Sequence, residues 1–436
     1  MKIRSLNNAT VLVDFVNIVM LIDPWLIGNL YKGAWSPYAK LKDLGFLKTV
    51  DVVFISHIHE DHWDVETLDL IPKTVKILIP RMKVNGVIER RLKERGFLSI
   101  SMLDLDTDVV LDENITIKVI SPLNSFAQDL GRYEDNYELD ATNIDTSLLI
   151  TDKKSKSSHL FLCDNTPYDT VRLVNSVNIE LTTLWYPFNS YAQDYPLCYS
   201  NLSDSEKKEI HNEMHEKRII STVAAINSLK PKYFFPHSAD FVLNGPHAEE
   251  FATYVNEDFM DRERVAVKYG AYLPQDTQSC SEVLNAGDEM LVNDNDIVIH
   301  RKLYEWTKSE PSLKLPELNA EPYVDLKSTL SQAFSGMVER VSRFGVDIKE
   351  TSDWVIIINA ESLRSFFCFR LLQLFDALDL TGRKVLEISL TDKQIAALLS
   401  RELHWNNAMI GCHLKFSRSP NQFCQPLYKA LNFLHV

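Results

Sequence analysis

Short apolar runs separated by polar turns fill most of the chain up to about residue 300. The runs at 50–56 and 75–80 are uninterrupted and rich in β-branched residues, which predicts buried strands. Further strands are expected within 9–24 (two, around a turn), 108–122 (a hairpin), 145–151, 158–164 and 231–241. Helical spacing of apolar residues predicts helices over 84–96 and over 204–228, the latter opening with an Asp-x-x-Glu-like cap. This mixture predicts an α/β or α+β sandwich.

The pattern breaks at residues 307–322, where Pro, Glu and Ser accumulate. We interpret this segment as a linker between a first domain, residues 1–306, and a smaller α+β domain, residues 323–436. The second domain is expected to open with a helix over LKSTLSQAFSGMVERVSRFG and to continue with a strand over DWVIIINA.

Composition limits the partners and the compartment. The 436 residues carry 46 Lys and Arg against 60 Asp and Glu, a net charge of −14, which argues against a nucleic-acid partner because phosphate binding needs a basic face. No apolar run reaches about 18 residues, so no membrane span is expected. The N-terminus lacks the apolar core of a signal peptide. Six scattered cysteines without a Cys-x-x-Cys pair predict a reduced, cytoplasmic protein and exclude an iron–sulfur cluster held by paired ligands of this chain.

The stretch FISHIHEDHWD, residues 54–64, concentrates metal-binding groups directly after an apolar strand. It presents His57, His59, Asp61 and His62 in the order His-x-His-x-Asp-His. Imidazole and carboxylate groups are ligands for borderline metals such as zinc and iron. In a tight loop, alternate residues can face one metal while the Asp-His pair faces another. A solvated charge cluster would explain one or two of these residues but not the whole pattern, which predicts a metal site.

Two metals need more ligands than this loop supplies, and two later residues at strand ends fit. Asp164 ends the apolar strand SHLFLCD, where a carboxylate can project over a sheet edge and bridge two ions. His237 follows the strand KYFFP. The simpler interpretations are a helix N-cap for Asp164 and a hydrogen-bonded loop histidine for His237. Their strand-end positions favour the interpretation as metal ligands.

The motif, together with the later strand-end Asp and His, resembles the metallo-β-lactamase superfamily. The segment NNATVLVDFVNIVMLIDPWLIG resembles a sub-branch that contains N-acylphosphatidylethanolamine phospholipases, ascorbate-lactonase-like proteins and CMP-N-acetylneuraminate hydroxylases. DPWLIGNLYKGAW, ISHIHEDH, IDTSLLI, AQDYPLCY and LKPKYFFPHSADF are similar to segments of the hydroxylases, in the same order. The resemblance covers roughly residues 8–275 and implies an αββα sandwich with the metal site at one edge.

Members of this superfamily usually carry a third-motif histidine one strand before the bridging aspartate, and here the sequence departs from them. His159 lies within a strand and is expected to be packed rather than to bind metal. At the expected place, just before TSLLI, stands Asp145; nearby alternatives are Glu138, Asp140 and Asn143. With Asp145, the resemblance implies a first metal held by His57, His59, Asp145 and Asp164, and a second held by Asp61, His62, His237 and the shared Asp164.

A carboxylate in place of a histidine favours iron or manganese over zinc, because hard anionic donors stabilise higher oxidation states. The chain is similar in this respect to a metallo-β-lactamase-fold β-hydroxylase of the chloramphenicol pathway, which has an acidic residue at this motif and a diiron centre. The first hypothesis is therefore a diiron oxygenase that uses O₂ on a small-molecule substrate. The sialate hydroxylases carry a Rieske domain for which this chain has no Cys/His pairs, so electrons are expected from a separate protein or from the substrate.

The second hypothesis is a dinuclear zinc or manganese hydrolase of phosphodiesters, lactones or amides. A hydroxide that bridges the metals would attack the substrate, and Asp61 would orient it or take its proton. A third hypothesis, a non-catalytic metal-binding scaffold, is disfavoured because the ligand set is complete.

Other groups have two interpretations each. His211 and His215 stand four apart on the expected helix, a spacing that can hold one metal, but their charged neighbours favour a solvated face. Aromatic residues either line a substrate pocket or pack in the core, namely Trp185, Tyr186, Phe188, Tyr191, Tyr195 and Tyr199. Residues 402–423 either lend a polar wall to that pocket or form a structural network. The Asp23-Pro24-Trp25 corner is expected to shape the floor of the metal site.

Overall fold

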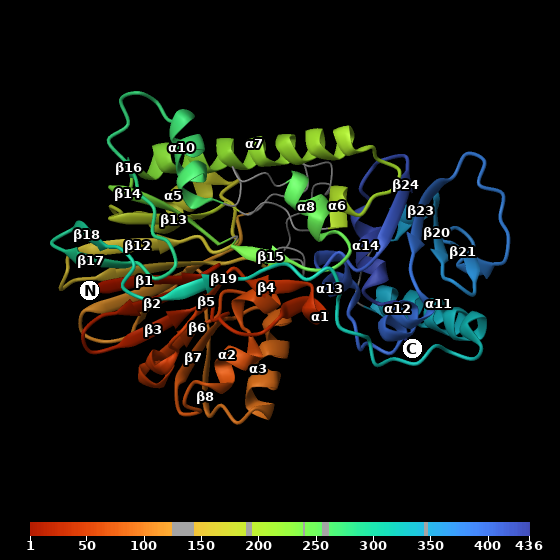
Figure 1. The fold of residues 1–436 in the computed structure, drawn as a ribbon, viewed down its shortest axis with the longest axis horizontal. Coiled ribbons are helices and arrows are strands. Elements are labelled where there is room, and N and C mark those ends of the chain that lie inside the picture. Colours follow the sequence, from red (N-terminus) through yellow and green to blue (C-terminus); the bar gives the residue numbers. More distant parts are fainter. Residues whose placement is uncertain (124–143, 189–193, 239, 255–260, 344–347) are drawn as a thin grey trace.

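Two mixed β-sheets packed face to face, with helices on both outer faces, form the N-terminal part of the computed structural model (Figure 1). The structure describes residues 1–123, 144–188, 194–238, 240–254, 261–343 and 348–436. A separate five-stranded sheet with its own helices lies toward the C-terminus. The αββα sandwich expected from the sequence is therefore confirmed.

The larger sheet has the strand that precedes the histidine-rich loop in its interior. Its order is β18 (Asp296–His300), β17 (Glu289–Asn293), β1 (Lys2–Asn7), β2 (Thr10–Asp14), β3 (Val19–Ile22), β6 (Val52–Phe54), β7 (Lys76–Pro80) and β8 (Ser99–Leu103). Strand β6 pairs in parallel with both β3 and β7, and all its residues are buried. A strand buried on both faces needs the continuous apolar run that the sequence has here.

The second sheet brings several strand ends to one edge. Its order is β16 (Cys280–Ser281), β14 (Tyr233–His237), β13 (Thr183–Pro187), β12 (Ser157–Phe161), β11 (Ser147–Asp152), β10 (Ile115–Ile120) and β9 (Asp108–Val110). Strands β12, β13 and β14 are parallel, so their carboxyl ends lie at the same edge. Strand β11 runs antiparallel to β12 and therefore starts there. The Thr146 hydroxyl donates to the Ser56 carbonyl at 2.8 Å, which joins this edge to the loop after β6.

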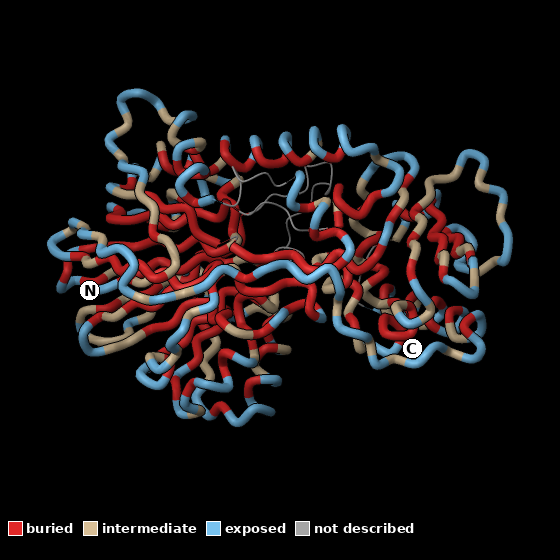
Figure 2. Tube along the Cα trace, in the orientation of Figure 1, coloured by how far each residue is buried: buried red, intermediate tan, exposed pale blue. Residues whose placement is uncertain are grey.

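Helices cover the outer faces of both sheets. The described helices are α1 (Leu30–Gly33), α2 (Val65–Asp69), α3 (Gly86–Glu94), α5 (Thr170–Val177), α6 (Asp194–Leu197), α7 (Asp204–Leu229), α8 (Ala248–Tyr254) and α10 (Arg262–Ala271) in the N-terminal part. The tube in Figure 2 shows that α7 buries the face toward the sheet. Its N-cap is Ser203 in a capping box with Glu206, one residue earlier than the expected Asp-x-x-Glu cap.

The C-terminal unit contains α11 (Leu326–Arg343), α12 (Asp392–Leu399), α13 (Trp405–Ile410), α14 (Gln425–Leu431) and a sheet ordered β22 (Gln373–Phe375), β21 (Arg364–Cys368), β20 (Trp354–Asn359), β23 (Lys384–Ser389) and β24 (Lys415–Ser419). One buried apolar cluster joins this unit to the region around α1: it includes Tyr31 and Trp35 as well as Phe334 and Trp354. The C-terminal unit is thus packed against the segment that precedes the metal-binding loop.

The segment expected as a linker begins within a strand. Strand β19 (Trp306–Lys308) pairs antiparallel with β5 (Ala39–Leu41). A second small sheet, β15 (Phe241–Leu243) with β4 (Trp35–Pro37), lies near it. The chain therefore crosses from the sandwich to the C-terminal unit along an ordered path.

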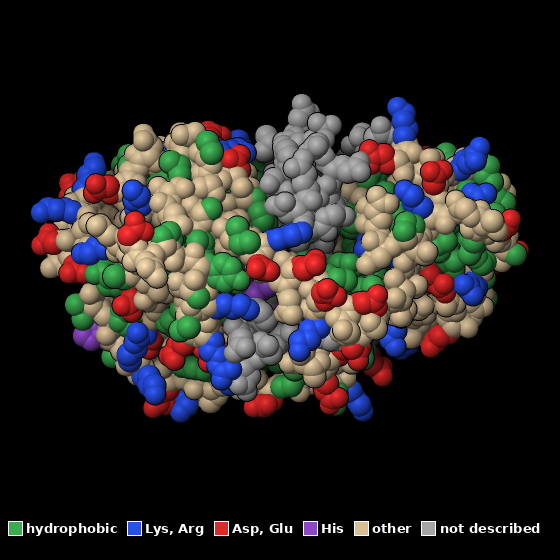
Figure 3. All heavy atoms as spheres, turned by 90° about the horizontal axis from the view of Figure 1, so that it is seen from above, with side chains coloured by type: hydrophobic (Ala, Val, Ile, Leu, Met, Phe, Trp, Pro, Cys, Tyr) green, Lys and Arg blue, Asp and Glu red, His purple; other side chains and the backbone are tan. Residues whose placement is uncertain are grey.

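Charged side chains of both signs are interspersed on the face shown in Figure 3. This is the distribution of an ordinary protein surface, in keeping with a composition that is acidic overall. Within the described ranges, the helices are too short or too polar to cross a bilayer.

Candidate metal centre

Strand ends bring the predicted ligands to one edge of the sandwich. The histidine-rich loop follows β6, Asp164 follows β12, and His237 is the last residue of β14. Asp145 precedes β11, whose first residues pair with the end of β12. Carboxyl ends of parallel strands meet at one edge, so residues far apart in sequence converge here.

The first group of side chains consists of His57, His59 and Asp145, whose ligand atoms all lie within 4.8 Å of one another. His57 Nε2 is 2.9 Å from His59 Nδ1 and 3.4 Å from Asp145 Oδ1. The other ring nitrogen of His57 contacts Ser56 Oγ at 2.9 Å, which leaves Nε2 facing the group. The alternatives Glu138, Asp140 and Asn143 lie outside the described residues.

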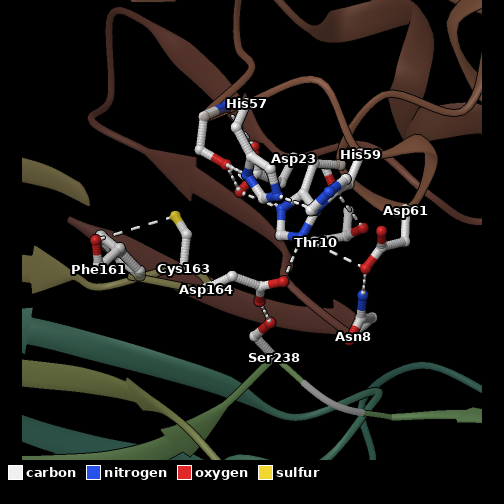
Figure 4. A network of polar contacts seen from close by, with 12 residues as sticks. Asn8, Thr10, Asp23, His57, His59, Asp61, Phe161, Cys163, Asp164 and Ser238 are labelled. Atoms are coloured by element: carbon white, nitrogen blue, oxygen red, sulfur yellow. Dashed lines mark hydrogen bonds and ion pairs between the residues drawn. The ribbon is translucent and has the colours of Figure 1, made fainter. Parts of the chain in front are cut away.

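The second group consists of His57, His62 and Asp164, again within 4.8 Å. His62 Nε2 is 3.2 Å from Asp164 Oδ2 and 3.3 Å from Asp61 Oδ2. His57 belongs to both groups, so the two groups are adjacent. Asp164 Oδ1 accepts a hydrogen bond from the Ser238 hydroxyl (Figure 4). Asp164 is thus fixed between the histidine-rich loop and the end of β14.

His237 is fully buried next to this second group but belongs to neither. Its ring stands edge-on against Trp185, with centroids 5.7 Å apart at 81°. Among the described residues, neither ring nitrogen of His237 has a hydrogen-bond partner, while Nε2 of His62 faces the carboxylates of Asp61 and Asp164. Buried polar atoms almost always have a partner, so the unpartnered nitrogens of His237 fit a site that takes metal ions.

The Asp23 carboxylate supports the histidine-rich loop through polar contacts, as expected for the Asp-Pro-Trp corner. Its carboxylate accepts from Ser56 N at 2.7 Å, from Ser56 Oγ at 2.8 Å, and lies 2.8 Å from His62 Nδ1 (Figure 4). The backbone of Asp23 has φ 46°, a left-handed conformation that Asp tolerates better than most residues. A carboxylate on the far nitrogen fixes the tautomer and aims Nε2 of His62 at the site.

Without metal, the charges of the site compensate one another. Burial opposes protonation of His62, but the surrounding carboxylates, led by Asp61 and Asp164, outweigh it and raise its pKa well above the ordinary value. Burial also disfavours the Asp164 carboxylate, yet His62 and His57 hold the pKa of Asp164 far below its ordinary value. Burial lowers the pKa of His57, which favours its neutral form. A metal ion at the second group would therefore displace the proton of His62.

Tyr31 and Asn8 hold Asp61, and sequence reasoning missed both. The Tyr31 hydroxyl donates to Asp61 Oδ1 at 2.7 Å, and Asn8 Nδ2 donates to Asp61 Oδ2 at 3.0 Å. Neither residue lies in a metal-binding motif. The only signal was their place within segments that carry the family resemblance, NNATVLVD and DPWLIGNLYKG.

The expectation of a solvated face for His211 and His215 is wrong. They are 3% and 1% exposed, and their rings stack with centroids 5.9 Å apart. The buried face of α7 also carries Lys207 and Arg218 among its apolar residues, so its inward face is not purely apolar. Neither histidine belongs to the two groups of metal-binding side chains found in the described part of the chain.

The remaining candidates are mostly structural. His159 is buried and bonded to Thr183 and Ser157, as expected. The N-cap of α5 is Asp169, so Asp164 does not cap this helix. Four of the aromatic residues are buried in core clusters, namely Trp185, Tyr186, Phe188 and Tyr199, while Tyr191 lies outside the described residues. Residues 402–423 do reach the loop, through a hydrogen bond from Asn407 to Glu60.

This sandwich, with a His/Asp loop at one sheet edge, defines an α+β metallo-β-lactamase-like protein. Residues 2–104 match the family described as Beta-lactamase superfamily domain. The suspected family resemblance is confirmed.

Similar proteins include members of the suspected sub-branch. The UPF0173 protein YddR of Bacillus subtilis is 29% identical over 121 residues, which are 24% of this chain and 45% of that protein. The cytidine monophosphate-N-acetylneuraminic acid hydroxylase of Asterias rubens is 33% identical over 72 residues, 16% of this chain and 11% of that protein. Each match covers less than half of the relative's length.

Solved structures with a similar fold include metal-dependent hydrolases and a diiron hydroxylase. The CmlA diiron β-hydroxylase from Streptomyces venezuelae aligns over 65% of this chain and 53% of its own, with a TM-score of 0.42 and 16% identity. A possible metal-dependent hydrolase from Veillonella parvula has the same TM-score, 0.42.

The role of Asp23 predicts the effect of replacing it. In Asp23→Asn protein without metal, we expect the pKa of His62 to fall, because one of the carboxylates that raise it is gone. Imidazole NMR over a pH titration measures this, and an unchanged His62 titration would contradict the assignment. With metal, loss of the carboxylate behind the ring should weaken binding about 10–100-fold.

Proposed function

We propose that this chain is a dinuclear metal enzyme with His57, His59, Asp61, His62, Asp145, Asp164 and His237 as metal ligands. The two adjacent groups of side chains and the unpartnered ring nitrogens of buried His237 support this proposal. The first metal would take His57, His59 and Asp145, and Asp164 would be shared. Asp61, His62 and His237 would complete the second site.

We favour a diiron oxygenase that hydroxylates or oxidises a small molecule. The observation that carries this choice is Asp145, whose Oδ1 lies 3.4 Å from His57 Nε2 where the superfamily usually has a histidine. A hard oxygen donor favours iron or manganese over zinc. The short similarity to a hydroxylase supports the same choice. Electrons would come from a separate electron-transfer protein or from the substrate.

The metals, when bound, would supply O₂ activation in an oxygenase, or a water of lowered pKa in a hydrolase. The protein's part is geometric. Asp23 holds a proton on Nδ1 of His62 so that Nε2 faces the metal. Ser56 orients His57 in the same way. The aromatic wall of Trp185 and Phe161 behind His237 keeps bulk water from that side.

The alternative is a dinuclear zinc or manganese hydrolase of phosphodiesters, lactones or amides. The contacts of Asp61 favour it as a second candidate. Asp61 is buried beside His62, at a place where a carboxylate could orient an attacking water. In this reaction Asp61 is the residue that would take the proton.

Metal analysis distinguishes the diiron oxygenase from the dinuclear hydrolase. Protein expressed in medium with iron, zinc and manganese should carry about two irons per chain, with ferric absorption typical of carboxylate-bound iron. Two zincs, with hydrolysis of a generic phosphodiester in the absence of O₂, would overturn the oxygenase and establish the hydrolase. Fewer than one metal per chain after metal loading would overturn both.

Asp145→His tests the residue that carries the choice. If Asp145 is a ligand, histidine should shift the bound metal from iron toward zinc, because imidazole is a softer donor than carboxylate. Elemental analysis of protein from the same medium measures the iron-to-zinc ratio. An unchanged ratio would remove Asp145 from the ligand set.

A further inference from the structure

Two residues of the C-terminal unit, Asn407 and His413, bond to the metal loop and to α1. Asn407 Nδ2, on α13, donates to Glu60 Oε1 at 2.7 Å. Glu60 Oε2 accepts from the backbone N–H of Tyr31 at 2.8 Å. His413 Nε2 contacts the backbone carbonyl of Tyr31 at 2.7 Å. Tyr31 is thus held at its N–H through Glu60 and at its carbonyl by the C-terminal unit.

The backbone of Tyr31 needs such support. It has φ 51° and ψ 50°, in the left-handed region that a tyrosine occupies only when its surroundings hold it there. The side chain is 1% exposed and packs edge-on against Trp35, with ring centroids 4.9 Å apart. Backbone and ring together fix the direction of the hydroxyl.

That hydroxyl determines how Asp61 faces the second site. It donates to Oδ1 of Asp61 at 2.7 Å, so Oδ1 is engaged on the side of α1. The other oxygen, Oδ2, lies 3.3 Å from His62 Nε2, on the side of the proposed metal. Asn8, in the turn between β1 and β2, supports the same orientation by donating to Oδ2 at 3.0 Å. Without the Tyr31 hydroxyl, Oδ1 of Asp61 would lose this hydrogen bond and only the Oδ2 side would hold the carboxylate.

We propose that Tyr31 is a positioning residue of the second metal site, and that the C-terminal unit keeps it in place through Asn407 and His413. This inference rests on the proposed dinuclear centre and adds a role for residues 323–436. The C-terminal unit is then a part of the metal site's framework rather than an appended module. A hydrogen bond to the outer oxygen of a ligating carboxylate fixes its direction and tunes its donor strength.

Tyr31→Phe removes the hydroxyl and keeps the ring that packs on Trp35. Metal-free protein is titrated with Co²⁺ against a chelator, and the visible absorption of each bound equivalent is recorded. We expect the second equivalent to bind about 10–100-fold more weakly and its ligand-field bands to shift. The first equivalent, at His57, His59 and Asp145, should bind as in the wild type.

Tyr233→Phe is the matched control. The Tyr233 hydroxyl also donates to a carboxylate, that of exposed Asp296 at 2.5 Å, but at the half-buried start of β14. Both Co²⁺ equivalents and their spectra should be unchanged in this variant. A shift in Tyr233→Phe equal to that in Tyr31→Phe would attribute the effect to general loosening and overturn the inference.

Asn407→Ala tests the route through the C-terminal unit. It leaves Tyr31 and every proposed ligand intact, and we expect a smaller weakening of the second equivalent only. If Tyr31→Phe does not fold, this variant decides alone, and wild-type affinity in it overturns the inference. A wild-type protein that binds fewer than two Co²⁺ ions would instead refute the proposed dinuclear centre. Two ions bound identically by the wild type and Tyr31→Phe would refute only the role of Tyr31.

Discussion

Replacing Asp164 by asparagine should reduce the metal content from about two ions per chain to about one. The neutral amide keeps the size of the side chain but loses the anionic oxygen that lies 3.2 Å from His62 Nε2. A free metal concentration of 1,000 times Kd stabilises a protein by about 4.1 kcal/mol per site. At that metal concentration the variant should therefore lose about 4.1 kcal/mol of metal-induced stabilisation, the contribution of one site. Elemental analysis and unfolding with and without metal measure both effects.

In metal-free protein, the stability lost on replacing Asp164 by asparagine should depend on pH, because Asp164 and His62 both titrate. The pKa of Asp164 is depressed, so its stabilising effect is present above the ordinary carboxyl pKa of about 3.9 and fades as pH falls below it. The pKa of His62 is raised, so its contribution is complete below about 6.5 and is lost as pH rises through the folded value. The deficit of Asp164→Asn should be largest between about pH 4 and pH 6.5.

Asp69→Asn provides the control for this substitution. Asp69 pairs with Lys73 and Arg95 at the surface, where such ion pairs contribute about 0–1 kcal/mol. Its metal content should equal that of the wild type. If Asp164→Asn also kept two metals, Asp164 would not be a shared ligand.

The positions of the proposed ligands could be predicted because each is tied to a local pattern. The histidine-rich loop, Asp164 and His237 all follow apolar runs, and the ends of parallel strands in one sheet share an edge. The end of each strand can be recognised from a few neighbouring residues. The ends lie close together because the strands of the second sheet that carry Asp164 and His237 run parallel.

The supports of the site could not be predicted, because they depend on contacts between distant residues. Asn407 and Glu60 are separated by 347 positions, and nothing in either local sequence indicates the other. The burial of His211 and His215 was hidden for a different reason. Their neighbours in the sequence are charged, which favoured a solvated face, but this helix buries charged and polar side chains as well as apolar ones.

Trp185→Ala should cause the largest loss of stability, about 3–5 kcal/mol. Trp185 is fully buried and stacks between Phe161 and Phe235, with centroids 5.1 Å and 4.5 Å away. Its removal leaves a cavity between the two sheets that the surrounding strands cannot close. Since domains are usually stable by 5–15 kcal/mol, this is a large fraction of the total. Urea unfolding of metal-free protein, followed by circular dichroism, measures it.

Trp306→Ala is the matched control, because Trp306 is only half-buried on the two-stranded sheet with β5 and should cost far less. Trp185→Phe should recover part of the loss by keeping an aromatic ring in the stack. Equal costs for Trp185→Ala and Trp306→Ala would contradict the assignment of Trp185 to the inter-sheet core.

Trp185 also stands edge-on against His237, so its loss should let that imidazole move. The alanine variant should therefore bind the second metal more weakly even under conditions where it remains folded, which links the core of the sandwich to the chemistry at its edge.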